Sequence, residues 1–81
     1  MVLFGVDVHG VYQAGISFSR LASEGYSYAV IKATEGTNFR PVNFEAWVAA
    51  TRAAGMIPGG YHFLRAGDGA AQARFFLDRI R

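Results

Sequence analysis

EGYSYAVI (residues 24–31) and AGMIPGGY (residues 54–61) are the two stretches that decide the fold class. In each, a glycine ends a helical pattern, and an extended apolar run follows almost at once. Glycine is common just past the C-terminus of a helix, and aromatic and β-branched residues favour strands. The two stretches therefore predict two helix-to-strand junctions, separated by about thirty residues, the length of one βα unit.

Outward from these junctions, the chain divides into three units, each a strand followed by a helix. The expected strands are residues 2–8, 26–33 and 57–64, and the expected helices are residues 17–25, 43–55 and 68–81. Ser17 and Asn43 stand where they can cap the first two helices. The third helix is expected to begin near Asp68.

The third helix carries a regular apolar pattern that continues to the end of the sequence. The residues spaced to share one apolar face are Ala73, Phe76, Leu77 and Ile80. We therefore expect residues 1–81 to be a single portion of a larger domain, incomplete at its C-terminal end.

Strands that alternate with helices predict an α/β fold with a parallel sheet and right-handed crossovers. Two architectures fit three consecutive βα units: a doubly wound sheet and the first part of a (β/α)₈ barrel. A barrel repeats this unit eight times, so three units would form three-eighths of it.

Composition and charge exclude several classes of protein. The 81 residues are 52% hydrophobic and carry a net charge of +2, without a run of like charges, so we expect no nucleic-acid partner. The chain has no cysteine, which excludes disulfides and thiolate metal sites, and we expect neither metal nor cofactor. No stretch reaches the roughly 18 apolar residues of a membrane span. No basic region precedes the first apolar run, so no signal peptide is evident.

Polar side chains gather where each expected strand ends, which is where parallel α/β sheets place their functional residues. They are Asp7 and His9 in the first unit, Lys32, Thr34 and Glu35 in the second, and Tyr61, His62 and Arg65 in the third. Strict alternation along a strand puts Asp7 and His9 on one face, and Lys32 and Thr34 together on one face.

Two carboxyl groups from adjacent strands would suit glycoside hydrolysis, which needs one protonated and one ionised carboxyl. Asp7 and Glu35 are available for these roles. Plainer interpretations remain open for each residue. Asp7 would then be a turn or capping residue, Lys32 a structural partner of a carboxylate, and His62 a hydrogen-bonded core residue.

Four segments together resemble the N-terminal part of glycoside hydrolase family 25, the Chalaropsis-type lysozymes common among phage endolysins. They are GVDV (5–8), YQAGISFSRLASEGYSYAVIKATEGT (12–37), AGMIPGGYHF (54–63) and AAQARFFLDRI (70–80). The resemblance implies a β/α barrel and an N-acetylmuramidase that cleaves the glycosidic bonds of peptidoglycan. It also implies that residues 1–81 are a single N-terminal portion of that catalytic domain.

The resemblance also implies roles for individual residues. Asp7 matches the first active-site aspartate, Lys32 and Glu35 lie in the KATEG segment, and Tyr61 and His62 lie in the segment that lines the cleft. His9 is a further lining candidate at the first strand end. The proposed general acid of the family is a glutamate in an Asp-x-Glu motif, and the 81 residues contain no such motif.

Peptidoglycan is therefore the expected partner. We expect full activity to need the remaining barrel portion, in the same chain or in another, or self-association. The enzyme would be made in the cytoplasm of a bacterial host, encoded by a phage or a bacterium, and would act on the cell wall. The alternative is a non-catalytic fragment that binds glycan or assembles with a partner chain.

Overall fold

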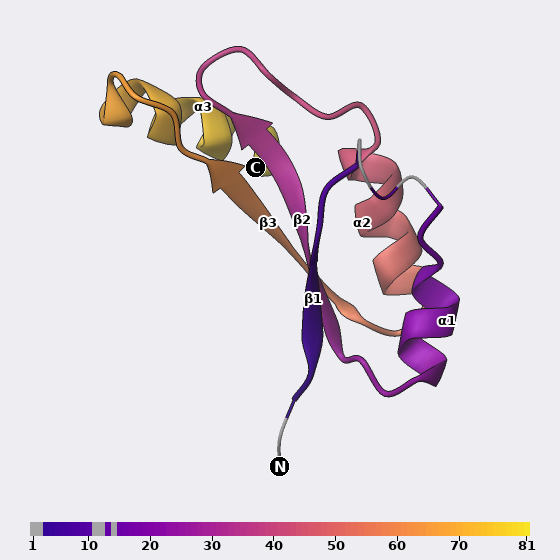
Figure 1. Ribbon diagram of the computed structural model, residues 1–81. Coiled ribbons are helices and arrows are strands. Elements are labelled where there is room, and N and C mark those ends of the chain that lie inside the picture. The colour runs from indigo at the N-terminus through magenta and orange to yellow at the C-terminus, as the bar shows by residue number, and fades with distance from the viewer. Residues whose placement is uncertain (1–2, 11–12, 14) are drawn as a thin grey trace.

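The computed structural model describes residues 3–10, 13 and 15–81, and Val2 of the first expected strand lies outside them. Its elements are β1 (Gly5–Val8), α1 (Phe18–Ser23), β2 (Tyr28–Glu35), α2 (Phe44–Ala53), β3 (Ile57–Phe63) and α3 (Gly69–Ile80), as Figure 1 shows. The predicted alternation of strands and helices is confirmed. Within the described residues, no helix is long and apolar enough to cross a membrane.

The strands form one parallel sheet in the order β1-β2-β3, which confirms the predicted α/β fold of three βα units. Three parallel strands in this order occur both in the first part of a (β/α)₈ barrel and in the first half of the classic doubly wound sheet. β2 is the central strand, and β1 and β3 are its two edges. Residues 28–31 of β2 pair with both neighbouring strands, whereas the rest of β2 pairs with β3 alone.

The two faces of the sheet differ in what covers them. A Cβ atom at Gly60 would lie 3.3 Å from Ile80 Cγ2 and 3.4 Å from the Phe44 ring, so α2 and α3 cover the same side, which we call the helix face. Its core consists of Val8, Phe18, Ala29, Ile31, Ala33, Phe44 and Met56. The opposite side, the open face, carries exposed side chains such as Tyr28 and Ile57.

Ser17 and Asp68 make capping hydrogen bonds at the starts of α1 and α3, whereas Asn43 makes none at the start of α2. Ser17 Oγ accepts a hydrogen bond from the Arg20 amide at the start of α1. Asn43 occupies the cap position of α2 but makes no capping bond, because its Nδ2 donates to the Gly10 carbonyl 3.3 Å away. Asn43 therefore ties the loop after β1 to α2.

The apolar face predicted for α3 is only partly covered. Phe76 packs against the core and Ile80 lies over Gly60, while Leu77 and Ile80 remain 40% and 42% exposed. Gln72 is instead the buried residue of α3, at 2% exposed. Gln72 faces the sheet because its hydrogen-bond partners, His62 and the Arg65 backbone, lie on that side.

Replacing Asp68 by Ala is expected to lower the free energy of unfolding by about 0.5–2 kcal/mol, the usual effect of losing an N-cap. Asp68 Oδ1 accepts hydrogen bonds from the Ala70 and Ala71 amides at 3.0 and 3.1 Å. Urea unfolding measures the loss. Asp78→Ala, at an exposed acid on the same helix, is the control, and an equal loss in both variants would contradict the capping role.

Candidate active site

Asp7 and Tyr61 lie on the open face, near the C-terminal ends of their strands. Asp7 pairs with Val30 of β2, and Tyr61 pairs with Lys32, two residues further along β2. Burial raises the pKa of the Tyr61 phenol, and the charges of Asp7 and Glu35 raise it further. Tyr61 therefore stays protonated at neutral pH and can donate a hydrogen bond close to both carboxylates.

A β-bulge at Ala33 decides which β2 side chains reach this site. Lys32 pairs with Tyr61, but Thr34 pairs with the very next residue of β3, His62. Two residues of β2 thus span one step of β3, and the alternation of β2 is reset. The prediction that Lys32 and Thr34 share a face is wrong: Thr34 turns to the helix face with His62, while Lys32 and Glu35 meet on the open face.

Lys32 is the buried cation of the site, with 2% of its surface exposed. Its Nζ lies 3.0 Å from His9 Nε2 and pairs with Glu35 Oε1. The centroids of the Phe63 and Phe39 rings lie 4.9 and 5.3 Å from the same Nζ. A buried ammonium is tolerated only with such compensation, so these four residues form a fixed unit with Lys32.

Glu35 is held between two cations. Lys32 pairs with one carboxylate oxygen, and the Arg65 guanidinium pairs with the other. The hydrogen bond from Lys32, followed by that from Arg65, holds the pKa of Glu35 below its ordinary value of 4.5. Glu35 is therefore ionised at neutral pH with both oxygens engaged, which makes it a counter-ion and not a proton donor. Asp7 is the carboxylate left for chemistry among these site residues.

The lowered pKa of Glu35 predicts a loss of stability in acid. Near and below pH 4.5, the unfolded chain binds a proton at Glu35 that the folded chain does not, so the free energy of unfolding falls as pH falls. Urea unfolding between pH 3 and pH 7 measures this dependence, which we expect to be weaker in Glu35→Gln. An acid dependence identical in both proteins would contradict the assigned role.

His62 lies apart from the other five predicted site residues. It faces α3, with Nδ1 2.8 Å from Thr34 Oγ1 and Nε2 2.9 Å from Gln72 Oε1. Its ring meets the edge of the Phe76 ring on the helix face. Since Tyr61 points to the open face, strand alternation turns its neighbour His62 to the other side. The structure therefore does not bring His62 to the cleft.

Phe39 is a site residue that sequence reasoning missed. It lies in the loop after β2, and its backbone forms a two-bond bridge with Glu35. That bridge folds the loop back so that the Phe39 ring reaches Lys32. An isolated aromatic residue in a polar loop carried no signal of this contact.

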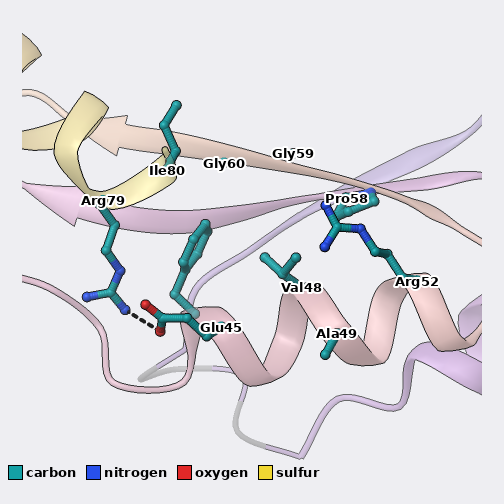
Figure 2. A pocket seen from close by; sticks show the side chains of 10 residues that line it. Glu45, Val48, Ala49, Arg52, Pro58, Gly59, Gly60, Arg79 and Ile80 are labelled. Carbon is teal, nitrogen blue, oxygen red and sulfur yellow. Dashed lines mark hydrogen bonds and ion pairs between the residues drawn. The ribbon is translucent and has the colours of Figure 1, made fainter.

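Two hollows differ in how near they lie to the candidate site. One, of about 470 Å³, lies between the loops after β2 and β3, beside the Glu35–Arg65 pair, and Thr37, Asn38 and Asp68 give it a polar lining. The other, of about 380 Å³, lies between α2 and α3 and has the Arg79–Glu45 ion pair at its rim, as Figure 2 shows. Only the first adjoins the candidate site. Within the described residues, no three His, Cys, Asp or Glu side chains cluster as metal ligands would.

Comparisons with known proteins point to one family. The profile of glycosyl hydrolases family 25 matches residues 6–81. Over 74 residues the chain is 46% identical to lysozyme M1 of Streptomyces globisporus. The matched segment covers 89% of this chain and 25% of that protein. The crystal structure of a bacterial lysozyme from Streptomyces coelicolor superposes with a TM-score of 0.86 at 42% identity, covering 96% of this chain and 36% of that one.

A family 25 glycosyl hydrolase from Bacillus anthracis superposes with a TM-score of 0.89 at 32% identity, covering 99% of this chain and 37% of that one. The chain thus spans between a quarter and two-fifths of the length of the proteins it matches. The matched parts include all three βα units and every candidate residue from Asp7 to His62.

Proposed function

Because this chain belongs to glycosyl hydrolases family 25, we propose that it supplies part of the active site of a muramidase that cleaves peptidoglycan, with Asp7 as a catalytic carboxylate. The observation that carries the proposal is the grouping on the open face. Asp7, Tyr61 and the Lys32–Glu35 pair come from three different strands and meet at their C-terminal ends. Functional residues of parallel α/β folds collect at this end.

Each of these groups has a part in the proposed chemistry. Asp7 is exposed, so a substrate can reach its carboxylate, which would act on the sugar as base or nucleophile. The protonated Tyr61 hydroxyl can donate a hydrogen bond to a sugar oxygen or to Asp7. Lys32 and Glu35 neutralise each other, so they fix the wall of the site without competing for the proton. The second carboxyl that hydrolysis needs would come from outside these 81 residues.

The substrate side of the proposal rests on the polar hollow between the loops after β2 and β3. Its side chains offer hydroxyl, amide and guanidinium groups that suit sugar hydroxyls. The Phe63 ring, 51% exposed at the end of β3, offers an apolar surface for a sugar face. We propose that the enzyme acts on the bacterial cell wall, as a phage or bacterial lysin, and that the sheet continues into a β/α barrel in the same chain or a second one.

The test is a chimera in which this chain replaces the matching 74-residue segment of lysozyme M1. We expect the chimera to release reducing ends from purified peptidoglycan. The 81-residue chain alone is expected to sediment with peptidoglycan without cleaving it, since Glu35 is not free to act as an acid.

Three outcomes would contradict the proposal. A folded chimera without hydrolytic activity would contradict the enzymatic function. Rapid cleavage by the 81-residue chain alone would contradict the missing second carboxyl. A chain that neither sediments with peptidoglycan nor supports cleavage in the chimera would exclude both the catalytic function and the alternative of a glycan-binding fragment.

A further inference from the structure

Gln72 is an unusual residue to find at the most buried position of α3. It is 2% exposed and faces the sheet, where an apolar side chain would be the ordinary choice. All of its polar atoms are engaged: Oε1 accepts from the Arg65 amide at 3.0 Å and meets His62 Nε2 at 2.9 Å, and Nε2 donates to the Arg65 carbonyl at 2.8 Å. A buried amide this well satisfied fixes the groups around it.

The atom types also fix which group donates and which accepts in each of these buried hydrogen bonds. The Arg65 amide can only donate, so the Gln72 atom facing it must be the oxygen. His62 Nε2 then donates its proton to the same oxygen, and in the neutral imidazole Nδ1 accepts from the Thr34 hydroxyl at 2.8 Å. These hydrogen bonds run through His62 and anchor Gln72 to Thr34, a fully buried residue of the central strand.

Arg65 gains its only described backbone restraints from this side chain. It follows β3 in a stretch where Leu64, Ala66 and Gly67 are all exposed. Gln72 binds both its N–H and its C=O, as a neighbouring strand would. With the backbone fixed, the side chain passes over Gly36, where a Cβ atom would lie 3.4 Å from Arg65 Cγ, and its guanidinium reaches Glu35.

We propose that Gln72, anchored by His62, is a positioning residue for the cleft. By clamping the Arg65 backbone from the helix face, it holds Arg65 on Glu35, and Glu35 in turn holds Lys32 beside His9. The role of these contacts in catalysis rests on the proposed muramidase function. The clamp on the Arg65 backbone, however, is a property of the folded protein. Both measurements below therefore use the 81-residue chain and require no hydrolysis.

The first measurement follows the Glu35 carboxyl carbon by NMR as pH is lowered. In Gln72→Met, which keeps the length of the side chain and removes its hydrogen bonds, Arg65 is released and the pKa of Glu35 is expected to shift up toward 4.5. Asp68→Ala is the matched control, because it weakens the same helix and leaves the Gln72 contacts in place. A Glu35 titration in folded Gln72→Met that matches the parent would overturn the proposal.

The second measurement needs no variant and decides the case if Gln72→Met does not fold. Hydrogen exchange of the Arg65 amide in the parent chain is expected to be several times slower than that of the Ala66 amide. Equal exchange at both positions would show that Gln72 does not hold the loop, and would overturn the proposal. A chimera that fails to hydrolyse peptidoglycan would change neither result.

Discussion

Asp7→Asn in the lysozyme M1 chimera is expected to reduce peptidoglycan hydrolysis by about 10³-fold, within the range that one acid–base group contributes. Asparagine keeps the shape of the side chain and removes the charge that a developing sugar cation or an attacking water requires. Asp7 is exposed at the end of β1, so the change leaves no buried group without a partner. The initial rate of reducing-end release measures the effect.

The control for this experiment is Asp78→Asn, which removes the same charge from an exposed position on α3. It is expected to leave the rate unchanged. Both variants are expected to unfold at the urea concentration of the parent chimera, which separates lost chemistry from lost structure. An Asp7→Asn enzyme as active as the parent would remove Asp7 from the mechanism and leave it as an ordinary strand-end residue.

The order of elements could be predicted from the sequence because its signals are local. Gly25 and Gly55 end the first two helices with φ of 97° and 82°, a conformation that favours glycine. Ser17 and Asp68 cap helices that begin at the next residue. Each of these features depends on residues within one turn, so nothing distant was needed to interpret them.

The site could be predicted only in part, because its geometry depends on the bulge at Ala33. Regular alternation joins Lys32 to Thr34 and separates Lys32 from Glu35, whereas the structure does the reverse. The position of a bulge is set by how β2 pairs with β3, about thirty residues away in sequence, a separation typical of a βα unit. The sequence therefore predicts which residue types lie at the strand ends, but not which face of the sheet each of them occupies.

The packing of α3 could not be predicted for a related reason. Its inward-facing polar residues find partners outside the helix: Gln72 bonds the Arg65 backbone, and Arg79 donates to the Pro41 carbonyl at 2.7 Å. Hydrophobic periodicity assigns polar residues to solvent, so it could not predict that Gln72 faces the sheet.

Ile31→Ala is expected to lower the free energy of unfolding by about 2–5 kcal/mol, the usual cost of removing a buried isoleucine side chain down to Cβ. Ile31 is 1% exposed and is the largest fully buried side chain, at the centre of the middle strand. It lies between Val8 of β1 and Gly60 of β3, so no neighbour can easily fill the space. A chain of this length has about 4–12 kcal/mol of stability in total, so the loss would be a large fraction.

Ile57→Ala is the matched control, because it makes the same substitution where 66% of the side chain is exposed. It is expected to cost a small fraction of the Ile31 loss when both are measured by urea unfolding. The Ile31 variant is also expected to lose the Lys32–Glu35 pair at a lower urea concentration than the Ile57 variant, since the adjacent residues of β2 hold that pair on the open face. Equal losses in the two variants would mean that the helix face is not the core, and the site built on its reverse side would lose its support.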